Sequence, residues 1–384
     1  MRIFIVAGEA SGDQLGASLV RAVRSRFSGC EVRGVGGSAM QEAGVASLFP
    51  LSDIAVMGLG PVIRRLPTIL RRMHETVSAI HTFKPDVLVT IDSPDFSKRV
   101  ARKVRSKCPS IATLHWVCPS VWAWRPGRAP AMRPYIDHIL CLLPFEPAAL
   151  ERLSGPNGTY VGHPLLEKTA LLRPQQADEA GARAAQVDPL ILVLPGSRQA
   201  EIRRLLPLFL ATIRDFPVPG AQFQLPTLEH IEPLVRQIVE ASGVAVTITT
   251  GDAAKYAGMR RARAALAASG TVTLELALAG IPMITAYKMA GWEAAIARQL
   301  VSAPSAILAN LILGNNFIPE FLQEAATASA MGPALARLCD DSPERDRQIR
   351  GMDRLEAAMA LPDGASPSAL AADILASMVR KMHQ

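Results

Sequence analysis

The sequence predicts an α/β protein of two domains, each built on a parallel β-sheet covered by helices. Three observations support this prediction. The 384 residues exceed one ordinary domain and suit two cores of roughly 150 to 200 residues each. Short apolar runs alternate with helical patterns, which is typical of parallel strands joined by crossover helices. The alternation starts again after a stretch rich in glycine and proline, so each half should fold as its own unit.

The first half begins with an apolar run at residues 3–7, which we interpret as a buried strand. The run is shorter than the apolar region of a signal peptide, and no cleavage-like segment follows it. A breaker-rich segment at 155–164 leads into a polar stretch at 173–188, which places the end of the first domain at residue 165. The other elements expected in this half are strands at 31–35 and 87–91 and helices at 15–26 and 97–107.

The second half repeats the pattern, and a second Rossmann-like domain is the natural interpretation. Two such domains facing each other across a cleft give the GT-B architecture. We therefore expect domains at 1–165 and 166–345 and a C-terminal helical segment at 346–384. Its amphipathic helix at 366–382 should return to the first domain or pack on a second subunit of a homo-oligomer. The second domain should contain strands at 190–194, 221–225 and 244–249 and helices at 199–214, 229–241 and 253–263.

Composition and charge exclude several classes of protein. Hydrophobic residues make up 49% of the chain and charged residues 20%, which is typical of a globular protein. No apolar stretch is long enough to span a membrane. The five cysteines have neither zinc-site spacing nor an even number for disulfides, so a reducing cytoplasm suits them best. The net charge of +7 favours anionic partners, but an aromatic content of 5% and the lack of a recognition motif argue against nucleic acid.

The first loop that could carry chemistry spans residues 8–13, between a strand and a helix. Its glycines allow close approach of a ligand to the backbone, and the N–H groups of a helix N-terminus favour anions. Ser11 and Gly12 are the candidate contacts. Alternatively, Ser11 and Asp13 only cap the helix, and the spacing does not decide between the two. The loop lacks the G-x-G-x-x-G pattern, which disfavours NAD.

Three carboxylates flank the strand expected at 87–91: Asp86 precedes it, and Asp92 and Asp95 follow it. An acid at the carboxyl end of such a strand can accept a proton from a sugar hydroxyl. Asp86 could instead be a turn residue, and Asp92 could cap the next helix. For Asp95 we favour the functional interpretation.

A third loop, at residues 115–128, holds three of the four tryptophans of the chain. Trp122 and Trp124 could stack on a sugar ring, and Arg125 could contact a phosphate. A core of buried aromatic side chains is the alternative, but Pro119 and Pro126 indicate a loop, where large aromatic residues usually have a functional reason.

Two further strand-to-helix loops lie in the second half. Residues 194–198 combine a glycine turn, a helix N-terminus and Arg198, with Ser197 beside it, which suits a diphosphate. The candidate contacts of the other loop are Ser269, Gly270, Thr271 and Glu275, whose carboxylate could hold two ribose hydroxyls. Capping of a helix is the structural alternative for Thr271 and Glu275.

Ten short runs match one family in order and spacing, and together they resemble lipid-A-disaccharide synthase from about residue 3 to 325. Trp116 and Cys118 stand where that family more often has tyrosine and serine, and Ala309 replaces a usual proline before Asn310. The runs lie at residues 7–13, 55–58, 84–86, 91–96, 119–125, 143–146, 161–164, 194–198, 268–271 and 319–323.

The resemblance implies an inverting glycosyltransferase that joins UDP-2,3-diacylglucosamine to 2,3-diacylglucosamine 1-phosphate, giving the β-1,6 lipid A disaccharide and UDP. It assigns the lipid acceptor to the first domain and the UDP-sugar to the second. Because the sequence has no D-x-D motif, we expect neither metal nor cofactor, and Arg198 and backbone amides should meet the charge on UDP. The family roles map to Glu9, Ser11, Asp86, Asp95, Arg198, Glu275 and Asn310, and we rank Asp95, Glu9 and then Asp86 as the general base.

The resemblance also implies a cytoplasmic protein at the inner face of the membrane. Residues 62–73 mix four arginines with aliphatic side chains, as an interfacial helix that meets anionic headgroups would. An ordinary amphipathic surface helix is the alternative. The rival functions are another GT-B glycosyltransferase or a UDP-sugar epimerase, and a non-catalytic protein that binds membrane or nucleic acid. Release of UDP from the two lipid substrates would distinguish them.

Overall fold

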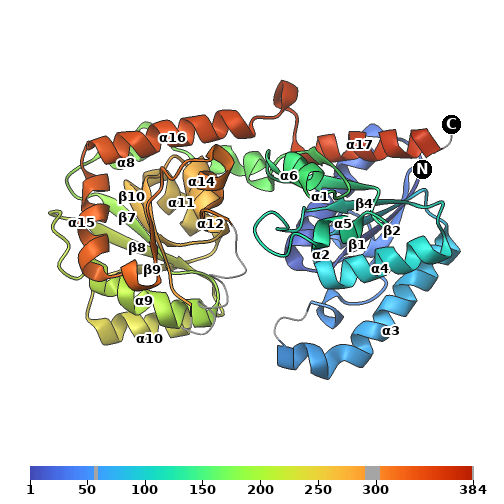
Figure 1. Ribbon diagram of the computed structural model, residues 1–384. Helices are drawn as coiled ribbons and strands as arrows, with labels where there is room; N and C mark the ends of the chain where they lie inside the picture. The colour runs from blue at the N-terminus through green and yellow to red at the C-terminus, as the bar shows by residue number, and fades with distance from the viewer. Residues whose placement is uncertain (56–58, 290–302, 383–384) are drawn as a thin grey trace. The chain divides into compact units, whose positions relative to one another are not determined.

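The computed structural model describes residues 1–55, 59–289 and 303–382, and the chain forms two compact units (Figure 1). The first unit contains Met1–Pro164 and the chain from Leu361 onward, and the second contains Leu165–Ala360. The first boundary agrees with the expected one. The second lies after residue 360 instead of 345, because the helix that begins at Pro343 packs on the second sheet.

The first unit is a six-stranded parallel sheet in the order β2-β1-β3-β4-β5-β6. Its strands are β1 (Arg2–Ala7), β2 (Glu31–Val35), β3 (Val87–Ile91), β4 (Ala112–Trp116), β5 (His138–Cys141) and β6 (Asn157–Tyr160). Its helices are α1 (Ala10–Arg26), α2 (Ser38–Glu42), α3 (Leu59–Phe83), α4 (Pro94–Lys107), α5 (Arg128–Met132), α6 (Glu146–Arg152) and α17 (Pro367–Met382), with short 3-10 turns at Leu51–Asp53 and Pro362–Gly364.

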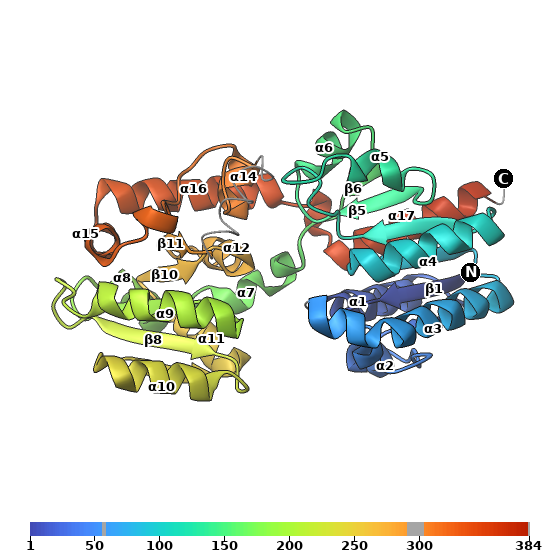
Figure 2. The same cartoon turned by 60° about the horizontal axis from the view of Figure 1, so that its bottom comes forward.

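Alternation along β1 shows how the sheet is buried on both faces. Ile3 and Ile5 pack with α1 and α17, whereas Phe4 and Val6 pack with α3 and α4. Successive side chains of a strand point to opposite faces, so a strand covered on both sides reads as one continuous apolar run. Helices accordingly lie on both sides of the strands in each unit (Figure 2).

The C-terminal helix α17 returns to the first unit, which is one of the two alternatives expected for it. Leu375 and Val379 are buried against the first sheet. Arg26 of α1 and Asp373 of α17 form an ion pair at 2.5 Å.

The second unit is also a six-stranded parallel sheet, in the order β12-β11-β10-β7-β8-β9. Its strands are β7 (Leu190–Leu194), β8 (Gln222–Thr227), β9 (Thr247–Thr250), β10 (Ala264–Ala268), β11 (Met283–Tyr287) and β12 (Glu320–Leu322). Its helices are α7 (Thr169–Leu172), α8 (Ala177–Ala184), α9 (Gln199–Ile213), α10 (Glu232–Ser242), α11 (Asp252–Arg261), α12 (Thr271–Leu278), α14 (Leu308–Leu313), α15 (Ala328–Cys339) and α16 (Pro343–Met359), with 3-10 turns at Pro164–Lys168 and Gln323–Ala325.

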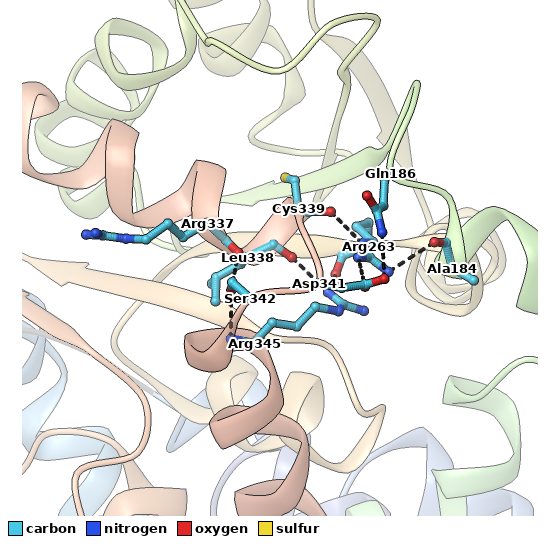
Figure 3. Close-up of polar contacts among 9 residues, drawn as sticks. All are labelled: Ala184, Gln186, Arg263, Arg337, Leu338, Cys339, Asp341, Ser342 and Arg345. Atoms are coloured by element: carbon cyan, nitrogen blue, oxygen red, sulfur yellow. Dashed lines mark hydrogen bonds and ion pairs between the residues drawn. The ribbon is translucent and has the colours of Figure 1, made fainter.

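Two buried arginines fix α16 to the second unit (Figure 3). The sequence suggested a helix up to residue 263, but α11 ends at Arg261, and Arg263 is buried just before β10. Its guanidinium donates to the carbonyls of Cys339 and Ala184 and pairs with Asp341 at 2.6 Å. Arg345 donates to the carbonyls of Arg263 and Leu338, both at 2.8 Å. Because a buried carbonyl without a donor is costly, these bonds hold the start of α16 beside β10.

The strand orders locate where ligands should bind. In the first unit the order reverses between β1 and β3, and in the second it reverses between β7 and β10. The loops at the carboxyl ends of two such strands diverge to opposite faces and leave a crevice, which is where open α/β sheets bind ligands.

Candidate active site

A cavity of about 380 Å³ lies at the carboxyl ends of β7 and β10 in the second unit. Five of the residues expected to bind substrate line it together, because the two loops that carry them meet at the strand-order reversal. They are Ser197 and Arg198 from the loop after β7, and Ser269, Gly270 and Thr271 from the loop after β10.

The loop after β7 has a conformation that presents Arg198 at the cavity. Gly196 has φ +110°, a conformation that residues with a side chain rarely adopt, and a Cβ there would lie 2.6 Å from a carboxylate oxygen of Glu201, which would have to move. Glu201 pairs with the Arg198 guanidinium at 3.1 Å. This pair is solvent-exposed on the arginine side and therefore weak, so an anion could replace or share the carboxylate.

Glu275 has a partner that the sequence analysis missed. The ammonium nitrogen of Lys255 lies 2.6 and 2.8 Å from the two carboxylate oxygens of Glu275, which is buried. Lys255 lines the cavity from the first turn of α11. The sequence signal was the Gly251-Asp252 turn after β9, a third strand-to-helix junction on the same sheet. Of this pair only Lys255 lines the cavity, so a nucleotide there would meet the ammonium group, with Glu275 behind it.

Asn310 lies in the second unit, in α14, but it is not among the residues that line the cavity. Its side chain is buried and bonded on both sides. The amide nitrogen donates to the Ile318 carbonyl at 2.9 Å and to Glu320 at 3.3 Å, and the amide oxygen accepts from the Ile318 N–H at 3.1 Å. These bonds give Asn310 a structural role in joining α14 to the start of β12.

The first unit brings the loops after β1 and β3 into contact. A Cβ at Gly8 would collide with the side chain of Ser93, and one at Gly12 would lie 3.3 Å from the carbonyl oxygen of Ile91. Ser11 donates to a carboxylate oxygen of Asp92 at 3.3 Å. Packing therefore requires glycine at position 8, whereas a Cβ at position 12 would need a small shift of its neighbours.

The turn after β3 is strained. Asp92 and Ser93 have φ of 50° and 43°, in the left-handed region that non-glycine residues rarely adopt. Two such residues in succession persist only where the surrounding structure holds them, and such strain gathers at functional sites. Asp95 follows in the first turn of α4, with an exposed side chain.

The other acids near these loops are placed differently. Glu9 is the N-cap residue of α1, but its side chain makes no capping bond. Asp13 is buried and caps α2, accepting from the N–H groups of Gly37, Ala39 and Met40 at 2.7 to 3.1 Å. Of the two alternatives left open for this loop, capping of α1 by Asp13 is wrong, because its carboxylate accepts from the N-terminus of α2 instead.

Asp86 and Asp95 lie at opposite ends of β3, Asp86 before the strand and Asp95 after it. Asp86 accepts a hydrogen bond from the backbone N–H of Arg2 at 2.7 Å, at the amino ends of β1 and β3. A five-residue strand is roughly 16 Å long, so Asp86 and Asp95 cannot act on the same hydroxyl. The carboxylate of Asp86 instead fixes the start of β1.

The tryptophan-rich segment divides into a buried and an exposed part. Trp116 is the last residue of β4 and is fully buried, so it belongs to the core. Trp122 donates from its ring nitrogen to Glu146 at 3.2 Å and packs edge-on against Phe145 at 5.0 Å. Trp124 is 37% exposed and carries the guanidiniums of Arg125 and Arg128 over its ring.

Glu146 is the residue that holds this loop, and the sequence analysis gave it no role. It is buried at the start of α6 and also accepts the backbone N–H groups of Leu142 and Leu143 at 2.9 and 3.0 Å. Burial raises the pKa of its carboxyl to about 7, although the three donors act in the opposite direction. The carboxyl therefore changes charge near neutral pH.

One group of potential metal ligands occurs within the described residues: Cys118, Cys141 and Glu146, all buried, with ligand atoms within 4.8 Å of one another. Glu146 already accepts three hydrogen bonds. A hydrogen bond to Cys141 and burial raise the pKa of the Cys118 thiol, which disfavours the thiolate that a metal requires. The cluster is a hydrogen-bonded core, and the expectation of a metal-free enzyme stays a prediction.

The basic segment expected to meet a membrane lies in α3. Among the described residues, no helix is long and apolar enough to cross a bilayer. Leu66 and Leu70 are exposed on α3. Arg72 forms ion pairs with Asp53 and Glu75, both at 2.7 Å. Its guanidinium is therefore not available to a lipid headgroup, although the sequence suggested that it would be. The side chain of Arg64 and residues 56–58 of the run at 55–58 lie outside the described residues.

Two Rossmann-like units with ligand-binding loops at their strand-order reversals define a protein of the GT-B class. Solved structures show the same fold. UDP-GlcNAc 2-epimerase from Neisseria meningitidis bound to UDP-GlcNAc has a TM-score of 0.63 at 12% identity, covering 99% of this chain and 100% of that chain. Sucrose-phosphate synthase from Thermosynechococcus elongatus has a TM-score of 0.59 at 16% identity, covering 100% of this chain and 99% of that chain.

Sequence comparison gives the particular family. The chain belongs to the lipid-A-disaccharide synthetase family, whose sequence profile matches residues 3–371. The lipid-A-disaccharide synthase of Nitrobacter winogradskyi is 50% identical over 99% of this chain and 96% of its own length. That of Rhodopseudomonas palustris (strain HaA2) is 48% identical over 99% of this chain and 97% of its own length. The resemblance found from the ten runs is confirmed.

Proposed function

We propose that this protein is the glycosyltransferase that joins UDP-2,3-diacylglucosamine to 2,3-diacylglucosamine 1-phosphate, giving the β-1,6 lipid A disaccharide and UDP. Membership of the family supports the reaction. The observation that carries it in this chain is the cavity at the ends of β7 and β10, because it combines the features that a sugar nucleotide requires. These are a glycine turn at Gly196, a guanidinium at Arg198 and two strand-to-helix loops.

The donor nucleotide binds in that cavity in our proposal. The diphosphate contacts Ser197, Arg198 and the backbone of the loop at Gly270, and the ribose lies near Glu275 and Lys255. Negative charge grows on UDP as the sugar leaves. Arg198 and oriented N–H groups stabilise that charge without a metal ion, because preorganised donors act most strongly where charge develops.

The acceptor is activated from the first unit. A single displacement inverts the anomeric carbon and needs one base opposite the leaving group. We assign that base to Asp95, with Glu9 as the second candidate, because both follow strand ends at the β1/β3 reversal. Ser11 and Asp92 shape the same loop pair, and Trp122 and Trp124 supply faces for a sugar ring.

Membrane association is part of the proposal, with the protein on the cytoplasmic side. Both substrates carry acyl chains, and α3 offers exposed Leu66 and Leu70 beside the exposed Arg65 and Arg71. Aliphatic side chains among basic residues are typical of a helix that lies at an anionic membrane surface.

UDP release tests the function. The purified chain is mixed with both lipid substrates in detergent, and UDP and the disaccharide are measured together. We expect equimolar products, and none when either substrate is omitted. An Arg203→Ala variant is the matched control for Arg198→Ala, because Arg203 lies on the same helix but not in the cavity. UDP release without disaccharide, or epimerisation of UDP-GlcNAc in place of transfer, would contradict the proposal.

A further inference from the structure

Three cationic side chains gather beside the tryptophan-rich loop of the first unit. The guanidinium carbons of Arg125 and Arg128 lie 4.5 and 5.0 Å from the centre of the Trp124 ring. Lys98, one turn after Asp95 on α4, is close enough for Arg128 to disfavour its charge and for Asp95 to favour it. We call Lys98, Arg125 and Arg128 the basic cluster.

The basic cluster is not neutralised by ion pairs. In the part of the chain that the structure describes, none of its three members lies within ion-pair distance of a carboxylate, whereas Arg72, Arg198 and Arg263 each do. Burial and the neighbouring Arg128 lower the pKa of the Lys98 ammonium. Asp95 favours the charge of Lys98 only, and none of the described carboxylates pairs with the two arginines, so an anionic ligand would stabilise this arrangement.

The backbone arranges the two arginines for this purpose. Arg125 has φ 51°, a left-handed conformation that is costly for a residue with a side chain. The N–H of Arg128 donates to the carbonyl of Arg125 at 3.0 Å, which closes the turn and directs both guanidiniums to one ring. Trp124 is 37% exposed, so the ring and its two cations face solvent in the absence of ligand.

We propose that Lys98, Arg125 and Arg128 bind the phosphomonoester of the acceptor substrate. This inference rests on the proposed function, in which the acceptor carries a 1-phosphate. A phosphomonoester has a charge of about −1.5 to −2 at neutral pH and three acceptor oxygens, which suits two guanidiniums and an ammonium. The group would be held beside Asp95, the residue to which we assign deprotonation of the acceptor hydroxyl.

The donor diphosphate is the other source of the same chemistry. The structure favours the acceptor, because the second unit already has a cavity with Arg198 and two glycine-containing loops for a diphosphate. The basic cluster belongs to the first unit, and none of its three members lines that cavity.

The test compares two acceptors, one with and one without its 1-phosphate, at saturating donor, and the KM for the donor is measured separately by varying its concentration. Wild-type protein should use the phosphorylated acceptor with higher kcat/KM. Arg125→Gln/Arg128→Gln should reduce that preference by about 100-fold, because each of the two lost charge-assisted bonds accounts for roughly a factor of ten. Arg102→Gln is the matched control: Arg102 also stacks on a ring in this unit, that of Tyr135 at 5.2 Å, but lies outside the basic cluster.

Lys98→Gln, on a different element, provides a second variant should the double variant fail to fold, as judged by circular dichroism. It should lose part of the same preference. A raised KM for the donor with unchanged acceptor preference would overturn the proposal in favour of the diphosphate. Unchanged preference and unchanged KM would also overturn it. An active wild-type protein that uses both acceptors equally would reject this inference alone, whereas absence of UDP release would reject the proposed function.

Discussion

The two units share an architecture but differ in the side chains of the loops at the carboxyl ends of their strands. In the second unit, the loops at the strand-order reversal contribute Gly196, Gly270 and Arg198 to a preformed cavity. In the first, the corresponding loops contribute acids, a strained turn at Asp92, and a nearby loop of tryptophans and arginines. A nucleotide diphosphate needs close backbone approach and fixed positive charge, whereas an attacking hydroxyl needs a base. In the function that we propose, the same strand-end geometry serves both partners of the transfer, and the side chains at the strand ends divide the roles.

The largest effect should come from the first unit, through Asp95. Asp95→Asn keeps the size and the capping ability of the residue but cannot accept a proton. We expect kcat to fall by about 10²- to 10⁴-fold, measured as UDP release at saturating substrates. Asp86→Asn, at the other end of β3, should lower stability and leave kcat within a few-fold. Near-normal turnover of Asp95→Asn would transfer the role to Glu9, to be tested as Glu9→Gln.

The corresponding test of the second unit is Arg198→Ala. Loss of one donor to developing charge typically costs about 10²- to 10³-fold in rate, so kcat should fall by that order while the unfolding transition is unchanged. Arg203→Ala should behave as wild type, since its side chain is exposed away from the cavity. If Arg198→Ala remained within a few-fold of wild type, the diphosphate would be held elsewhere, and the contrast between the two units would fail.

The Lys255–Glu275 pair should matter for stability as well as for binding. Lys255→Met leaves a buried carboxylate without its cation, which typically costs about 3 kcal/mol of unfolding free energy. The double variant Lys255→Met/Glu275→Gln should recover much of that loss because no buried charge remains. Urea denaturation of the two variants provides the measurement. Equal stability of the single and double variants would show that Glu275 is solvated well enough to stand alone.

Glu146 should make the stability of the first unit depend on pH near neutrality. Among the described residues, the second unit has no buried carboxyl with a pKa raised into this range. Burial raises its carboxyl pKa from 4.5 to about 7, so the folded protein holds a proton that unfolding releases. The resulting stabilisation is fully present below about pH 4.5 and is lost as the pH rises through 7. Its size is on the order of 3 kcal/mol.

The measurement is the difference in unfolding free energy between wild type and Glu146→Gln at pH 5 and at pH 8. We expect the unfolding free energy of the wild type minus that of Glu146→Gln to be lower at pH 8 than at pH 5, because only the wild-type carboxyl ionises. Glu151→Gln, an exposed position on the same helix, is the control and should show no such change. A pH-independent difference would mean that the carboxyl does not titrate in this range.

The smallest expected effect concerns α3. Arg71 is exposed, whereas Arg72 is engaged by Asp53 and Glu75. Each basic residue near an anionic surface contributes about 1 kcal/mol, so Arg71→Ser should weaken sedimentation with anionic vesicles about fivefold and Arg72→Ser should weaken it less. Equal binding by wild type and Arg71→Ser would indicate an ordinary surface helix.

Much of the fold could be predicted from local pattern. The strands at 3–7, 87–91 and 190–194 agree closely with β1, β3 and β7, because strands buried on both faces read as continuous apolar runs. The strand at 31–35 matches β2, in which exposed charged residues alternate with buried ones. The loops after β7 and β10 could be recognised as one site, since their strands belong to one parallel sheet. The family could be recognised as well, because its ten runs are local features of the sequence.

Tertiary structure decided the rest. The partners of Glu275 and Asp13, at Lys255 and α2, come from other elements, and no spacing along the chain indicates such pairs. The return of α17 to the first sheet depends on which of several apolar faces it covers. Sequence periodicity is a property of neighbouring residues and determines what each segment becomes, whereas packing between distant segments determines which side chains meet.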